Sequence, residues 1–189
     1  MCIRDSLTTG LPPHVTAATG IDAMVHAIEA YTSKIKKNPY SDMLARQALT
    51  LMSRHIVDAV DDGDNVDARQ AMLLGAMMAG QAFANAPVGA VHALAYPLGG
   101  HYHIPHGLSN SLVLPPVLRF NACVAEPLYA ELLPAVSGDS YSSASDGCEA
   151  FITHMEHLIT RVKLPTTLEE VAIQEQDLPM LAADAMEQQ

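Results

Sequence analysis

The sequence predicts an all-α protein with a single packed core. Of its 189 residues 49% are apolar, which is enough for one well-packed domain. Long segments rich in Ala, Leu and Met recur along the chain, and these residues favour helices. Val, Ile and Thr are not gathered into the alternating runs that are typical of strands. We therefore expect one mainly helical domain.

Proline, glycine and acidic runs divide the chain into six expected helices. Pro97 with the following glycine pair, and Pro115-Pro116, are expected to break or stop two of them, because proline lacks the N–H that a helix interior needs. The acidic run 61–65 lacks the order and the closing Glu of an EF-hand loop, so it predicts a solvated turn. A Ser-rich surface loop is expected over 137–147. Leu11-Pro12-Pro13 is a rigid entry to the first helix, which is expected to run to about 31; the others are expected over about 41–59, 66–86, 88–96, 106–114 and 148–162.

Charge and cysteine content exclude several kinds of partner. The formal net charge of −11 argues against binding to nucleic acid or to anionic membranes, both of which need clustered Lys and Arg. The three cysteines are odd in number and lack CxxC spacing, so they indicate reduced thiols in a cytoplasmic protein. The most apolar stretch, 71–91, contains Gln81 and Asn85 and is typical of a core helix rather than a membrane span.

Asp22 and His26 form the first candidate metal-binding pair. They are four residues apart in an expected helix, so they share one face of it and lie within reach of a single ion. The ordinary alternative is that Thr19 and Asp22 form a helix-capping pattern and that His26 is a core histidine. Taken alone, this pair favours the ordinary alternative.

His92 and His106 form the second candidate pair. On one straight helix, residues fourteen positions apart would be about 21 Å apart and could not share an ion. The prolines and glycines between 97 and 105 forbid that helix and let the chain turn back on itself. His101 and His103, in the same irregular segment, are competing candidates.

Taken together, one carboxylate and three imidazoles suit a borderline divalent ion such as Fe²⁺ or Zn²⁺. A metal hydrolase is disfavoured, because the H-E-x-x-H arrangement with its dedicated carboxylate base is absent. Neither a G-x-G-x-x-G nor a G-x-x-x-x-G-K-[ST] phosphate loop occurs in the sequence, so no nucleotide-binding loop is visible. No residue is assigned a catalytic role beyond metal binding.

Two segments carry a resemblance to a known family. The stretch 11–33, which contains Gly20-Ile-Asp-Ala-Met-Val-His26, and the stretch 89–121 closely resemble the two signatures of the iron-containing (group III) alcohol dehydrogenases. The likeness covers nearly the whole chain from Thr8 onward. The resemblance implies that the metal ligands are Asp22, His26, His92 and His106.

The resemblance also implies a fold and an activity. The fold is the helical C-terminal domain of the iron-containing alcohol dehydrogenase / dehydroquinate synthase-like fold, without the N-terminal Rossmann-like domain that binds NAD(P). Residues 8–189 would form the helical metal-binding domain, truncated at its C-terminus, and 1–7 a stub outside the family pattern. The implied reaction is hydride transfer between an alcohol and NAD(P), with Fe²⁺ or Zn²⁺ polarising the substrate oxygen.

Partners and alternatives follow from the same resemblance. A small-molecule alcohol or aldehyde is the implied substrate, a homo-oligomer is among the implied partners, and the isolated chain is expected to be inactive without its dinucleotide domain. Many relatives carry a histidine where this chain has Tyr96, so no histidine proton relay is assigned and Tyr96 is a candidate pocket residue. A zinc-dependent polyol dehydrogenase relative and a catalytically inactive helical interaction module stay open as alternatives. Metal content separates the last of these, since a scaffold needs no ion.

Overall fold

The computed structural model describes residues 5–87 and 89–187, and within these ranges its regular elements are all helices. The all-α prediction is confirmed. No single helix in the described ranges is both long and apolar enough to cross a membrane, although the helices Val66–Asn85 and Ala90–Tyr102 taken together as a bent pair reach that length and composition. The α-helices are α1 (Pro13–Thr32), α2 (Pro39–Asp61), α3 (Val66–Asn85), α4 (Ala90–Tyr102), α5 (His106–Val136), α6 (Ala144–Arg161) and α7 (Leu178–Glu187), and the short 3₁₀ turns are η1 (Asp5–Leu7), η2 (Glu169–Val171) and η3 (Glu175–Asp177).

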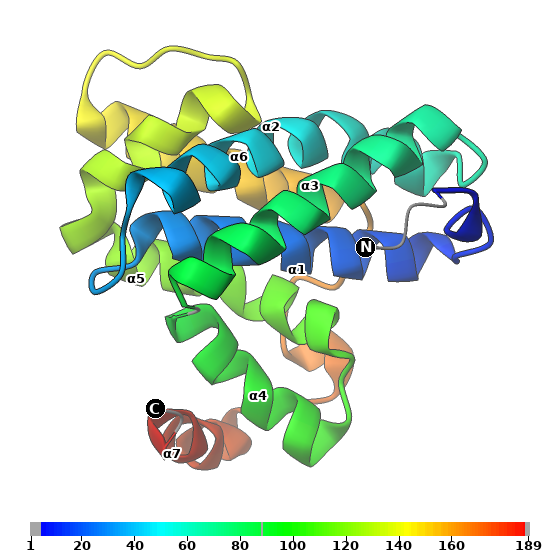
Figure 1. Ribbon diagram of the computed structural model, residues 1–189. Helices are drawn as coiled ribbons and strands as arrows, with labels where there is room; N and C mark the ends of the chain where they lie inside the picture. Colours follow the sequence, from blue (N-terminus) through cyan, green and yellow to red (C-terminus); the bar gives the residue numbers. More distant parts are fainter. Residues whose placement is uncertain (1–4, 88, 188–189) are drawn as a thin grey trace.

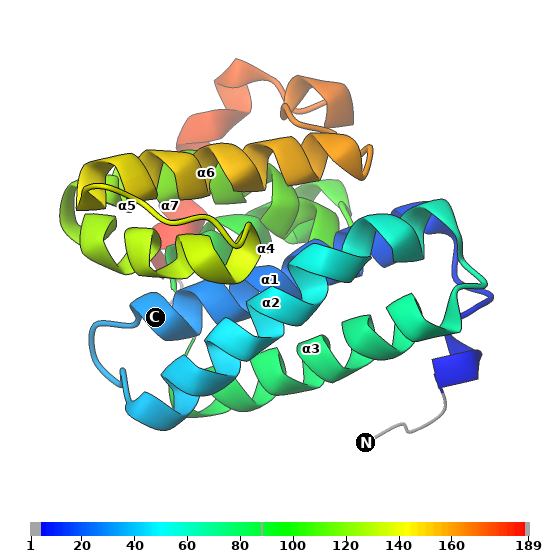
Figure 2. The ribbon, with the colours of Figure 1, turned by 90° about the horizontal axis from the view of Figure 1, so that it is seen from above.

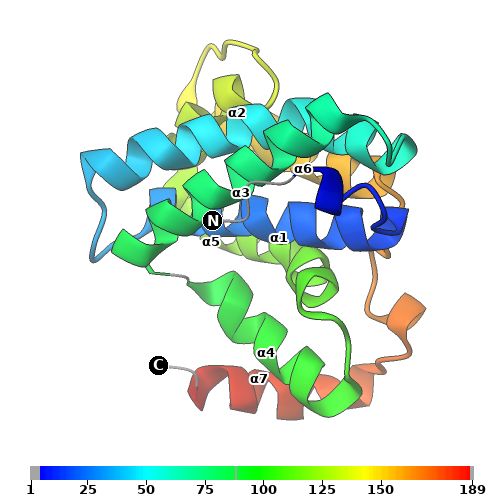
Figure 3. The ribbon, with the colours of Figure 1, turned by 45° about the vertical axis from the view of Figure 1, so that its right-hand side comes forward.

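Helix α1 lies at the centre of the molecule. It packs against α2 and α3 on one side and against α5 on the other, and α6 covers α5 (Figure 2). Helices α4 and α7 lie side by side below these five, as Figures 1 and 3 show from two directions. The chain enters α4 from α3 and leaves it through a short turn into α5, so α4 is tied to the bundle at both ends.

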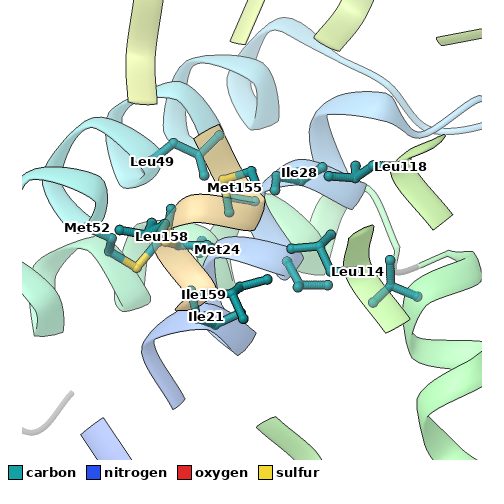
Figure 4. Close-up of a cluster of buried hydrophobic side chains, with 14 of the residues drawn as sticks. Ile21, Met24, Ile28, Leu49, Met52, Leu114, Leu118, Met155, Leu158 and Ile159 are labelled. Carbon is teal, nitrogen blue, oxygen red and sulfur yellow. The ribbon is translucent and has the colours of Figure 1, made fainter. Parts of the chain in front are cut away.

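The apolar core fixes which face of α1 points where. Figure 4 shows Ile21, Met24 and Ile28 of α1 among buried side chains from α2, α5 and α6. Each of these three side chains is at most 1% exposed, and full burial of such a side chain contributes about 1.5–3 kcal/mol. With this face held in the core, Asp22 and Glu29 on another face of α1 contact α5 and α4 respectively.

Side-chain caps explain where several helices begin. The side chains of Asn38, Asn65 and Ser143 accept hydrogen bonds from the first-turn N–H groups of α2, α3 and α6. The first three predicted helices are confirmed to within a few residues. Helix α6 begins at Ala144, four residues before the expected start at Cys148, because Ser143 caps it.

The prediction that prolines end two helices is wrong. Helix α4 continues through Pro97, and α5 continues through Pro115 and Pro116 to Val136. A proline in a helix interior costs about 3 kcal/mol. Around the proline pair, Leu114 and its neighbours Val117 and Leu118 are buried, each contributing about 1.5–3 kcal/mol, so packing outweighs the local cost. Val88, where the fourth helix was expected to start, lies outside the described residues.

Candidate metal centre

Three of the four proposed ligands converge from three helices. Asp22 lies on α1, His92 in the first turn of α4 and His106 at the first position of α5. One donor atom of each lies within 4.8 Å of the others, and Asp22 Oδ1 is 3.7 Å from His92 Nε2 and 3.6 Å from His106 Nε2. Ligand atoms of a tetrahedral ion with bonds of about 2.1 Å are about 3.4 Å apart. The donor types and these two spacings therefore fit a divalent metal ion.

The turn between α4 and α5 places His106 close to Asp22 and His92. His103 ends α4 in the left-handed conformation (φ 55°), and Pro105 precedes the first turn of α5. The backbone of Gly107 then meets α1 so closely that a Cβ atom there would lie 2.5 Å from the carbonyl oxygen of Ala18. Only glycine permits this approach, so Gly107 sets how near His106 lies to Asp22.

His26 lies beside the three converging residues, with its ring packed between two others. Its ring centroid is 4.5 Å from that of His92 and 4.5 Å from that of Phe83. Burial lowers the pKa of His26, although the nearby Asp22 carboxylate partly opposes this. The lowered pKa favours the neutral imidazole, which is the form that binds metals. Among the described residues, the cluster of converging donor atoms contains Asp22, His92 and His106 but not His26.

A buried carboxylate of α1 contacts the side of the His92 ring that faces away from the other ligands. Glu29 is 7% exposed, and its Oε2 lies 2.6 Å from His92 Nδ1, the ring nitrogen that faces away from Asp22. Its Oε1 accepts a hydrogen bond from the backbone N–H of Val91 at 2.7 Å. Glu29 is not among the ligands predicted from the sequence. The available signal was its place three residues after His26, on the face that already carries Asp22.

The amide of Asn110 lies among the three converging ligands. Its Nδ2 is 2.5 Å from Asp22 Oδ1, 3.1 Å from His106 Nε2 and 3.2 Å from His92 Nε2. An amide nitrogen can only donate, and it has two hydrogens for these three neighbouring atoms. Asn110 is fully buried, and its Oδ1 has no hydrogen-bond partner among the described residues. Sequence reasoning missed Asn110 too, although it lies one helical turn after His106.

The competing histidines lie elsewhere. His101 Nε2 pairs with Asp184 of α7, and His103 is an exposed residue at the end of α4. Tyr96 does border the centre: its ring is nearly parallel to that of His106, with centroids 5.8 Å apart, and it is 45% exposed. The capping interpretation of Thr19 is wrong, because α1 begins at Pro13 and the Thr19 hydroxyl donates to the Val15 carbonyl within the helix.

Comparison with known proteins identifies the family to which this centre belongs. Residues 16–189 match the family model described as the Fe-containing alcohol dehydrogenase family, C-terminal. The chain belongs to the iron-containing alcohol dehydrogenases. Its fold is accordingly the helical C-terminal domain of that family.

Curated relatives and solved structures agree on this family. Long-chain-alcohol dehydrogenase 1 of Geobacillus thermodenitrificans is 42% identical over 187 residues, which cover 98% of this chain and 47% of the relative. The 1,3-propanediol dehydrogenase of Klebsiella pneumoniae is 38% identical, over 95% of this chain and 46% of the relative. A crystal structure of 1,3-propanediol oxidoreductase superposes with a TM-score of 0.94 at 38% identity, covering 97% of this chain and 48% of that one. The chain thus spans about half the length of the relatives it matches.

Proposed function

We propose that this chain is the metal-binding half of an NAD(P)-linked, metal-dependent alcohol dehydrogenase that interconverts alcohols and aldehydes or ketones. The observation that carries the proposal is the convergence of Asp22 Oδ1, His92 Nε2 and His106 Nε2 within 4.8 Å. Family membership supports it, because the similar proteins are named alcohol and propanediol dehydrogenases. One similar structure, a sulfoacetaldehyde reductase from Bifidobacterium kashiwanohense at 27% identity and a TM-score of 0.84, is a complex with NAD⁺.

Each proposed ligand has a distinct part in the centre. Asp22 and the two converging imidazoles would hold Fe²⁺ or Zn²⁺, with His26 as the proposed fourth ligand. An ion bound there supplies a Lewis acid for the substrate oxygen. His92 is buried, whereas the side chain of His106 is 46% exposed and is bordered by the half-exposed Tyr96. The substrate would therefore approach from the side of His106 and Tyr96.

Metal content per chain tests this proposal. We expect about one iron or zinc per chain in protein purified without oxygen, measured by elemental analysis. The double variant His92→Ala/His106→Ala should lose that metal, because it removes two of the three converging donors.

A matched control removes two other histidines of the same region. His101→Ala/His103→Ala should keep the metal, since neither residue belongs to the cluster. Equal metal content in both double variants would contradict the proposed site. Absence of metal from the unaltered chain after anaerobic purification and reconstitution would contradict the proposed function.

The proposal also has a consequence for turnover. The nicotinamide would be supplied by the part of the relatives that this chain does not span, so this chain by itself should show no NAD(P)H-linked alcohol oxidation. Absorbance of NAD(P)H at saturating alcohol, with the metal-loaded chain, measures this. Sustained metal-dependent turnover by the chain alone would contradict the proposal that the metal and the nicotinamide are bound by different halves of the enzyme.

A further inference from the structure

The first turn of α4 is capped by a residue from another helix. The N-cap residue of α4 is Gly89, which offers no capping side chain, and the first N–H groups of a helix need acceptors. Glu29 of α1 supplies one by accepting from the Val91 N–H at 2.7 Å. A Cβ atom on Gly89 would lie 3.3 Å from Glu29 Oε1, so the glycine leaves space for the incoming carboxylate.

The second oxygen of the same carboxylate determines the protonation pattern of His92. An ionised carboxylate can only accept hydrogen bonds, so Nδ1, 2.6 Å from Oε2, must carry the ring proton. In that tautomer Nε2 has a free lone pair, and Nε2 is the atom that faces Asp22, His106 and the Asn110 amide. In metalloproteins a carboxylate behind a histidine commonly fixes the ring in this way.

We propose that Glu29 is a positioning residue of the metal centre, which holds the His92 imidazole in the Nδ1–H tautomer with Nε2 directed at the ion. The inference rests on the proposed function for its metal readout. Its geometry depends only on contacts within the chain. Both hydrogen bonds of Glu29 end on consecutive residues, Val91 and His92, so one buried side chain fixes the position of α4 and the orientation of its ligand.

The variant Glu29→Gln separates these two tasks. Its amide oxygen can still accept from the Val91 N–H, so the cap on α4 is kept. Its NH₂ group, however, cannot accept from His92 Nδ1–H, and the ring should change to the Nε2–H tautomer. We expect metal affinity 10- to 100-fold weaker, as is typical when such a partner is lost. Glu175→Gln, the same change at an exposed position, should leave the affinity unchanged.

Two readouts decide the result. Long-range ¹H–¹⁵N NMR spectra of labelled histidine report the tautomer of His92, and competition titration with Zn²⁺ reports affinity. A His92 ring protonated at Nε2 in the unaltered chain would overturn the proposal, whether or not any variant folds. Weaker metal binding in Glu29→Gln without a tautomer change would also overturn it, because Glu29 would then be only structural. If the unaltered chain bound no metal, the proposed function would fail, while the tautomer would still decide the role of Glu29.

Discussion

The two imidazoles that approach Asp22 are held in opposite ways. His92 is 1% exposed, and each of its ring nitrogens contacts a buried polar side chain, Glu29 on one side and Asn110 on the other. The side chain of His106 is 46% exposed; its Nε2 also lies near the Asn110 amide, but its backbone is fixed where Gly107 packs against α1.

This difference separates two ways of building a metal ligand. On the α4 side, hydrogen bonds to side chains set the orientation of the His92 ring. That orientation is therefore sensitive to substitutions that change the chemistry of a partner side chain but keep its volume. On the α5 side, close packing of α5 against α1 sets the position of His106, so a single added methyl group at Gly107 would disturb that position.

Gly107→Ala should be the most damaging change. Its Cβ atom would meet the backbone oxygen of Ala18 at 2.5 Å, and backbone cannot rotate away as a side chain can. We expect a loss of about 2–3 kcal/mol in the free energy of unfolding, as for other overpacked sites, together with weaker metal binding. Urea denaturation and a Zn²⁺ titration measure the two effects. Gly100→Ala, a helical position with open space around it, should instead stabilise the protein by about 0.5–1 kcal/mol.

Removing the imidazoles one at a time should give unequal results in the presence of a chelator. His92→Ala would leave the buried oxygen Oε2 of Glu29 without its partner, which costs about 1–3 kcal/mol, although Glu29 Oε1 keeps the Val91 N–H. His106→Ala changes a half-exposed side chain and should cost about 0.5 kcal/mol or less. Both variants should lose the stabilisation by Zn²⁺, about 2.7 kcal/mol at a hundred times its Kd. Equal losses under chelation would show that the two imidazoles are held in the same way.

The part of the centre that could be predicted from sequence is the part set by local spacing or by family resemblance. Asp22 and His26 share a face of α1 because they are four residues apart, and the structure places both at one end of α4. Glu29 and Asn110 could not be predicted from the sequence, because their contacts are with residues 63 and 88 positions away along the chain. No periodicity in one helix encodes such a contact.

The same dependence on contacts outside the helix explains why the sequence wrongly predicted that helices end at the prolines. The rule that proline ends a helix concerns local geometry, and it holds when nothing else fixes the backbone. At Pro115 and Pro116 the residues on both sides, Leu114 and Val117, are buried in the core, so the helix continues. Helix α5 packs against α1 and α6, so the burial of its residues depends on segments outside α5.

Asn110→Asp should alter the balance between the metal-free and metal-bound protein. The change replaces a donor 2.5 Å from Asp22 Oδ1 with a second carboxylate, so without metal we expect a loss of about 1–2 kcal/mol. A divalent ion would relieve the repulsion, so the rise in Tm on adding Zn²⁺ should exceed that of the unaltered chain. Thermal unfolding with and without Zn²⁺ measures this. Asn85→Asp, on the exposed end of α3, should change stability by about 0.5 kcal/mol or less and leave the Zn²⁺ effect unchanged.

The smallest effect is expected at the far end of α4. There His101 pairs with Asp184 of α7, but both side chains are more than a third exposed, and exposed ion pairs contribute about 0.2–1 kcal/mol. We expect Asp184→Ala to lower the free energy of unfolding by no more than about 1 kcal/mol, less at high salt, and to leave metal affinity unchanged. Urea denaturation at two salt concentrations and a Zn²⁺ titration check this. Loss of metal affinity would mean that α7 helps to hold His92, whereas unchanged affinity would show that α4 is positioned for the metal by its first turn and Glu29.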